Sequence, residues 1–149
     1  MRTLFLALLA VFILDASAAS AAETGQEENS TNKRIVMKFE NHEIHVAMNN
    51  SRASNDFIAM LPATLTFRDY NATEKVGDLP RKLSTSGSPV GFDPSVGDLT
   101  YYAPWGNLAL FYKDFGYSNG LVSLGKLESG VETLATMRGE FQVRLEVAE

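Results

Sequence analysis

Apolar and polar residues alternate strictly along residues 141–147, FQVRLEV, and this pattern constrains the fold more than any other feature of the chain. The same period of two runs through residues 35–39 and 44–48, with a polar turn expected at Asn41-His42 between them. A period of two places successive side chains on opposite faces of a strand. These segments therefore predict half-buried strands, and the first two predict a hairpin.

Further strands are predicted where short apolar segments are bounded by turn residues, at 63–67, 99–103, 108–112 and 121–127. Two short helices are also predicted. The first begins at Ser51 or Ser54, either of which can cap it, and carries Phe57 on its apolar face. The second opens at residues 129–132, SGVE, which has the form of a capping box.

Residues 70–98 are rich in Gly, Pro, Ser, Thr and Asp, and we expect them to form a long irregular excursion. Elsewhere strands outnumber helices. The residues alone therefore predict a mainly β domain, either an antiparallel barrel or a sandwich, with helices covering its openings.

The first 22 residues have the form of a secretory signal peptide. Arg2 supplies a positive start, residues 4–14 form an apolar run, and two A-x-A cleavage patterns follow within residues 16–21. The apolar run is about 11 residues long, whereas a membrane-spanning helix needs about 20. We therefore expect removal of residues 1–22 during export to the periplasm or the cell exterior.

The remaining chain is expected to hold a disordered leader, residues 23–32, and one folded domain, residues 33–149. The chain has no cysteine, and a domain of this size can rely on its own core without disulfides. The net charge of −5 offers no positive patch for nucleic acid or for an anionic membrane, so neither is an expected partner. The oligomeric state stays open.

No metal and no cofactor are expected from the residues. His42 and His45 are the only histidines, and on a strand their spacing directs them to opposite faces. The chain has no tight acidic cluster and no phosphate-binding glycine loop, and the stretch GLVSLG lies within a predicted strand.

Several segments resemble cyclophilins. The C-terminal stretch LVSLGKLESGVETLATM is similar to the cyclophilin C-terminal part, with matches at Gly125, Lys126, Leu127, Gly130 and Val131. Phe57 matches the phenylalanine of the first cyclophilin helix, which packs into the barrel. The strings LPRKL, GFDP and YYAPWGNLA are similar to a bacterial family of stand-alone cyclophilin-like domains. The resemblance implies a closed antiparallel β-barrel with two short covering helices, and it brings no established activity.

Cyclophilins are prolyl isomerases, and their site is matched only in part. Phe67 and Arg68 are adjacent, without the intervening histidine, and the Gln-Gly segment is absent. Leu121 stands at the histidine position, and Gly116 or Tyr117 stands near the tryptophan position. Isomerisation needs a donor aimed at the proline nitrogen, and either Arg68 or Arg81 could serve as that donor. The catalytic residue therefore stays open, with Arg68 as the candidate.

The segment 101–120 contains seven of the fifteen aromatic residues, including Trp105 in the loop Pro104-Trp105-Gly106. We expect a ligand site at the barrel opening near this loop. Arg81 is included because its guanidinium suits anionic or carbonyl groups. The candidate ligand-binding residues are Arg68, Arg81, Phe92, Trp105, Asn107, Phe111 and Tyr117.

Three functions follow from these residues. The leading hypothesis is an exported domain that binds a small molecule or an extended peptide. The first alternative is a weak or specialised peptidyl-prolyl isomerase, and the second is a structural or interaction module whose pocket is closed. A concave, polar-lined cavity beside Trp105 distinguishes the binding hypothesis from the closed module.

Overall fold

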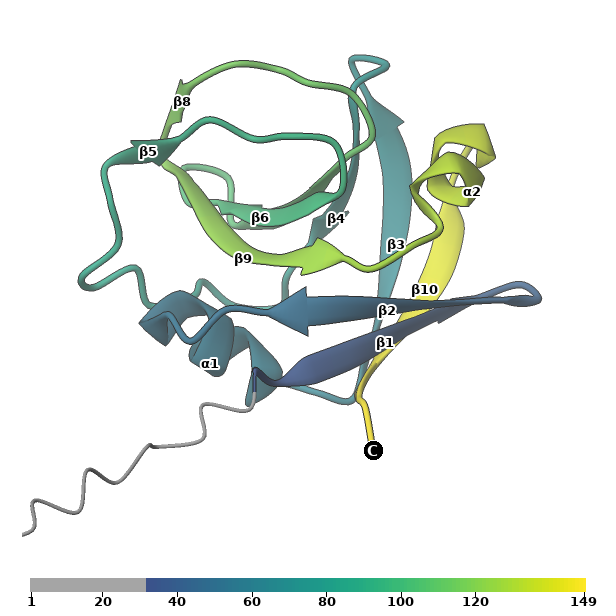
Figure 1. Cartoon of the computed structure of the whole chain (residues 1–149), viewed down its shortest axis with the longest axis horizontal. Helices are drawn as coiled ribbons and strands as arrows, with labels where there is room; N and C mark the ends of the chain where they lie inside the picture. Colours follow the sequence, from purple (N-terminus) through teal and green to yellow (C-terminus); the bar gives the residue numbers. More distant parts are fainter. Residues whose placement is uncertain (1–31) are drawn as a thin grey trace, which may run out of the picture. The chain divides into compact units, whose positions relative to one another are not determined.

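The computed structural model describes residues 32–149 (Figure 1). The predicted signal peptide and the predicted leader up to residue 31 lie outside the described residues. Within residues 32–149, no helix has the length and apolar character needed to cross a bilayer.

Eight strands of the described part close into an antiparallel barrel in the order β1-β10-β3-β4-β7-β6-β9-β2. Their bounds are β1 Arg34–Phe39, β2 His42–Met48, β3 Ala63–Tyr70, β4 Glu74–Asp78, β6 Asp98–Tyr102, β7 Asn107–Phe111, β9 Leu121–Leu127 and β10 Phe141–Val147. Two further short strands, β5 Gly91–Phe92 and β8 Ser118–Asn119, pair with each other outside the barrel. The fold class predicted above is therefore confirmed.

The alternating segments form the barrel wall as expected. Three alternating residues of β10, Phe141, Val143 and Leu145, are buried in the barrel core, and the last of the set, Val147, is exposed at the strand end. In β1, Ile35 and Met37 face the same core and are completely buried. The period-two pattern thus predicts both the strands and the face that each strand buries.

Helices α1 (Arg52–Ile58) and α2 (Val131–Thr136) lie at opposite ends of the barrel (Figure 1). Ser51 caps α1, since its Oγ accepts a hydrogen bond of 3.1 Å from the Ser54 amide. The predicted capping box at α2 is wrong. Gly130 caps that helix with a left-handed φ of 82°, a conformation that glycine adopts readily, and no side chain bonds the helix start.

Three local expectations are corrected by the structure. The hairpin turn lies at Glu40-Asn41, one residue earlier than expected, with Glu40 at φ 49°. Strand β4 runs through part of the segment predicted to be irregular, because it hydrogen-bonds between β3 and β7. The sequence Ser118-Asn119-Gly120 also predicts a tight turn, but Ser118-Asn119 instead forms β8 against β5. In the last two cases, pairing with a distant strand outweighs local turn chemistry.

Candidate functional site

The outer face of the barrel wall carries three parallel rows of side chains over β3, β4, β7 and β6. Strand register places Tyr70, Glu74 and Phe111 side by side in one row. A second row holds Asn107 and Tyr102, which are paired across β7 and β6. Between these two rows lies a middle row that includes Val76 and Ala109, which are paired across β4 and β7. Because these middle side chains are small and buried, the wall is hollowed between the two outer rows.

Trp105 lies at one end of this hollow. The turn between β6 and β7 ends at Gly106, whose φ is 73°. The Gly106 amide donates a hydrogen bond of 2.9 Å to the Tyr102 carbonyl. The indole stands nearly perpendicular to two tyrosine rings, with centroids 5.6 Å from Tyr70 and 5.3 Å from Tyr102. Edge-to-face aromatic pairs of this kind favour a defined ring orientation.

The segment 113–120 closes the other side of the hollow. Phe115 projects from it and packs on Phe111 with a centroid distance of 5.9 Å. Asp114 anchors the segment, because its Oδ1 accepts a hydrogen bond of 3.1 Å from the Val96 amide. Gly120 anchors it again by donating from its amide to the Val90 carbonyl at 2.8 Å.

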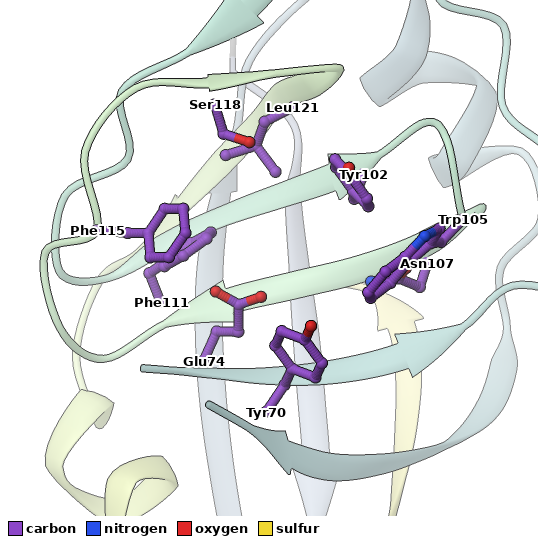
Figure 2. Close-up of a pocket in the computed structure, with 9 residues that line it drawn as sticks. All are labelled: Tyr70, Glu74, Tyr102, Trp105, Asn107, Phe111, Phe115, Ser118 and Leu121. Carbon is purple, nitrogen blue, oxygen red and sulfur yellow. The ribbon is translucent and has the colours of Figure 1, made fainter. Parts of the chain in front are cut away.

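The resulting outer-wall pocket has a volume of about 200 Å³. Figure 2 shows its side chains surrounding one space, with the Glu74 carboxylate and the Tyr70 hydroxyl directed toward that space. The residues that line it are Tyr70, Glu74, Tyr102, Trp105, Asn107, Phe111, Phe115, Ser118 and Leu121. Most of these are aromatic, and Glu74 is the only charged residue among them.

Glu74 is half-buried in this lining. Burial raises the pKa of its carboxyl above the usual range, and the nearby Asp69 charge acts in the same direction. A hydrogen bond of 3.4 Å from the Thr73 hydroxyl only partly offsets this effect. None of the ion pairs found among residues 32–149 includes Glu74. The carboxylate therefore lies in a low-dielectric site without a cationic partner.

Asn107 contributes a second acceptor group to this region. Its side chain is 3% exposed, and its Nδ2 donates to the Leu108 carbonyl at 2.9 Å. Its Oδ1 is buried without a hydrogen-bond partner in the described part of the chain. Unpartnered buried acceptors are uncommon in proteins and often mark functional positions.

An ionic cluster on the inner side of the wall supports the first row. Lys75 is 1% exposed, and its Nζ lies 2.9 Å from Asp69 Oδ1 and 2.7 Å from the Met137 carbonyl. The Tyr112 hydroxyl donates to the same Asp69 oxygen at 2.5 Å. These residues directly follow or precede Tyr70, Glu74 and Phe111, so the cluster holds the backbone that positions the pocket.

The cluster also changes the ionisation of its members. Burial raises the pKa of Tyr112 to about 12, assisted by its hydrogen bond to Asp69. For Asp69, burial acts to raise the pKa, but the hydrogen bonds from Tyr112 and Lys75 together lower it below the usual range. Both shifts favour the arrangement of a charged Asp69 accepting from a neutral Tyr112.

The structure brings together three of the seven residues proposed from the sequence, namely Trp105, Asn107 and Phe111. They lie on the outer wall of the barrel rather than at an opening. The openings lie under α1 and α2, whose Phe57 and Leu134 belong to the buried core. These three residues therefore lie elsewhere on the barrel than the sequence predicts.

The two candidate arginines do not line the pocket. Arg68 projects from the middle row, and its Nη1 lies 3.3 Å from Asp78 Oδ2. Arg81 forms a bidentate ion pair with Asp56 of α1, with Nη2–Oδ1 at 2.7 Å and Nη1–Oδ2 at 3.0 Å. This pair and the Ser84 amide lower the pKa of Asp56.

The remaining two candidates lie beside the pocket. Phe92 packs on the apolar cluster of the outer face that includes Phe111 and Leu121, and it lines a neighbouring hollow near α1. Tyr117 is 62% exposed, and its hydroxyl lies so close to Gly91 that a Cβ there would be 2.6 Å away. Both residues shape the segments that flank the pocket without lining it.

Sequence reasoning missed the lining residues Tyr70, Glu74, Tyr102, Phe115, Ser118 and Leu121. Tyr102 and Phe115 belong to the aromatic-rich segment 101–120, so that signal was present. Tyr70 and Glu74 carry no local signal, because their proximity to Trp105 depends on the register of β3, β4 and β7. Within residues 32–149, no group of three His, Asp or Glu side chains is arranged to hold a metal ion.

Comparison with known proteins assigns the chain to a family. The model of a family described as cyclophilin-like matches residues 37–146. The solution structure of a hypothetical protein from Archaeoglobus fulgidus is similar, with a TM-score of 0.65 and 17% identity. The similarity covers 82% of this chain and 99% of that one, and at this identity it concerns the fold. None of the curated proteins matches the chain in sequence.

Proposed function

The chain belongs to the cyclophilin-like family, and from that premise we propose that its barrel domain binds a small molecule or an extended peptide in the outer-wall pocket. A shared fold does not determine function, so the proposal depends on the pocket itself. It assigns the binding role to the residues that line the hollow, above all Trp105, Asn107 and Phe111.

One observation carries the proposal: large aromatic side chains are exposed around a concave site. Trp105 is 61% exposed, and Phe115 and Tyr70 are also exposed at the rim of the same pocket. Exposed apolar surface gathered at one place is typical of ligand-binding grooves and interaction sites. A small number of polar groups in an apolar hollow is likewise typical of sites that bind ligands.

The binding hypothesis is better supported than prolyl isomerisation. An isomerase needs a donor aimed at the proline nitrogen, and Arg68 is engaged by Asp78 outside the pocket. The charged group in the pocket is the Glu74 carboxylate, which accepts hydrogen bonds and does not donate them. A protease-coupled assay with a proline peptide tests the alternative, and turnover lost in Arg68→Ala would support it.

Ligand binding is expected to change the fluorescence of Trp105, which is the only tryptophan of the chain and lines the pocket. We expect saturable changes in its emission when a fragment library containing neutral, anionic and cationic compounds is titrated into the purified protein. Phe111→Ala is expected to weaken the binding of those compounds about tenfold, because it removes one wall of the pocket.

Ala148→Ser provides a matched control, since Ala148 lies near the C-terminal end and does not line the pocket. It should leave every titration unchanged. If no compound of any charge class alters Trp105 emission or shifts the amide resonances of the pocket residues, the proposed function is wrong.

We also propose that the protein acts outside the cytoplasm, in the periplasm or the extracellular space. The pattern of Arg2, the apolar residues 4–14 and the A-x-A sites supports this proposal. When the full chain is expressed in a bacterial host, the protein recovered from the periplasm is expected to lack residues 1–22. Mass spectrometry measures the change, and an uncleaved protein retained in the cytoplasm would contradict the proposal.

A further inference from the structure

We propose that the outer-wall pocket recognises an alkylammonium group, carried either by a small amine or by a lysine-type side chain of a peptide. This inference rests on the proposed function, because it names the ligand chemistry of the same pocket. It follows from the charge of the lining, from the arrangement of the aromatic rings and from the size of the hollow.

The charge of the lining favours a cation. Glu74 is the only charged residue that lines the pocket, and no lysine or arginine accompanies it. Its half-buried carboxylate has no ion-pair partner among residues 32–149, whereas nearby Asp69 is paired with Lys75 and Asp78 with Arg68. A desolvated carboxylate is unfavourable unless it is paired. A bound cation supplies the missing partner.

The aromatic residues add an attraction of the same sign. The ring faces of tryptophan and tyrosine attract a cation held within about 6 Å of the centroid. Trp105 lies 5.6 Å from Tyr70 and 5.3 Å from Tyr102, centroid to centroid, so one cation in the hollow reaches more than one ring. Figure 2 shows these three rings and the Glu74 carboxylate around the same space. An aromatic cage with one carboxylate is suited to an ammonium group.

The protein's own cations do not occupy this cage. The cation–π contact found among the described residues is that of Lys75 with Tyr112, 5.1 Å from Nζ to the ring centroid. That contact belongs to the inner ionic cluster, where Lys75 is also held by Asp69 and the Met137 carbonyl. None of the cation–π contacts found among residues 32–149 therefore involves a ring that lines the pocket.

Other ligand classes fit less well. An anion would be repelled by Glu74, and a purely apolar group would leave Glu74 without a counter-charge and the buried Asn107 Oδ1 without a donor. The volume of about 200 Å³ is smaller than the roughly 300–1,000 Å³ of pockets that enclose a drug-sized ligand. It accommodates a headgroup such as an alkylammonium, with the rest of the ligand extending past the exposed rim.

Three probes of similar shape test the charge preference: choline, its neutral isostere 3,3-dimethylbutan-1-ol, and the anion 3,3-dimethylbutanoate. Titrations use Trp105 emission and isothermal calorimetry on the purified protein. Choline is expected to bind about tenfold more tightly than the alcohol, and the anion is expected to bind most weakly. Equal affinity of choline and the alcohol would overturn the ammonium inference and leave the proposed function standing.

Glu74→Gln tests the role of the carboxylate, because it removes the charge and keeps the shape. We expect it to weaken choline binding about tenfold and to leave the alcohol unchanged. Glu140→Gln is the matched control, since Glu140 is exposed and lies outside the pocket. If Glu74→Gln binds choline as well as the wild type does, the inference is wrong.

Thermal stability separates a binding role of Glu74 from a structural role. Because the carboxylate is half-buried and unpaired, Glu74→Gln should melt no lower than the wild type while binding choline more weakly. If Glu74→Gln fails to fold, Tyr102→Leu provides the test. We expect this variant to bind choline more weakly and to retain its affinity for the alcohol. Unchanged choline affinity would overturn the inference.

A final pair of probes distinguishes the two sources of the ammonium group. A short peptide containing trimethyllysine is compared with choline in the same titration. Tighter binding of the peptide would indicate that the ammonium group belongs to a lysine-type side chain. Tighter binding of choline would indicate that it belongs to a small amine. If neither binds while neutral fragments do bind, the ammonium inference fails and the proposed function is retained.

Discussion

Asp69→Ala is expected to lower the free energy of unfolding by about 3 kcal/mol, because it leaves the charge of Lys75 buried and unpaired. Lys75 is 1% exposed, and once Asp69 is lost, the Met137 carbonyl remains as its one hydrogen-bond partner among the described residues. Removing one partner of a buried pair typically costs about 3–5 kcal/mol. We expect the lower end of that range, because the Asp69 side chain is 38% exposed and water can reach part of the site. Urea unfolding followed by circular dichroism measures the change.

Asp78→Ala is the matched control, since Asp78 forms an exposed pair with Arg68 on the neighbouring strand. Exposed pairs contribute about 1 kcal/mol or less, so this variant should stay close to the wild type. The double variant Asp69→Ala/Lys75→Met should recover most of the lost stability, because no charge is then buried. Equal effects of Asp69→Ala and Asp78→Ala would contradict the buried-charge argument.

The same ion pair predicts how wild-type stability depends on pH. The pKa of Asp69 is lower in the folded chain than in the unfolded chain. Ionised Asp69 therefore makes its full contribution to the free energy of unfolding above the unfolded-state pKa of about 3.9. That contribution is lost as the pH falls through the lower pKa of the folded state. In the Asp69→Ala variant, the free energy of unfolding should lack this part of its decrease at acidic pH.

Phe57→Ala is expected to lower the free energy of unfolding by about 3–5 kcal/mol, the range for removing a buried phenylalanine side chain. Phe57 is completely buried and carries α1 into the barrel core. The variant leaves a cavity beneath a helix of seven residues, which has little stability without its packing face. Urea unfolding again measures the effect, with a lower midpoint and a similar slope.

Phe115→Ala makes the same chemical change at an exposed site. Phe115 lies at the pocket rim and packs on Phe111, so its removal should cost about 1 kcal/mol or less. This control should lose ligand affinity and keep its stability, whereas Phe57→Ala should lose stability. A small effect of Phe57→Ala would show that α1 does not close the barrel end.

Much of the fold could be predicted from local pattern. The alternating segments became β1, β2 and β10 with the expected buried faces, and Ser51 caps α1 as one of two expected residues. Strand β4 was missed because its inward side chain is Lys75, which reads as polar although it is buried. Burial of that lysine depends on Asp69 and on the Met137 carbonyl, and neither is apparent from the period of the strand.

The candidate site was predictable only where its residues are close in sequence. The aromatic segment 101–120 pointed to Trp105, Asn107 and Phe111, which the structure places in one pocket. Arg81 was proposed as a ligand contact because it is basic and lies in a loop. Its bidentate ion pair with Asp56 arises from the packing of that loop against α1, which the sequence does not reveal.

By itself the sequence determined the mainly β architecture, the strands with one buried face and the aromatic character of residues 101–120, because these properties depend on neighbouring residues. Only the tertiary structure decided that the pocket lies on the outer wall. Register across β3, β4 and β7 places Tyr70, Glu74 and Phe111 in one row, and the turn after β6 brings Trp105 over it. Register is set by pairing between distant strands, so the meeting of Glu74 with the aromatic rings is a property of the closed barrel.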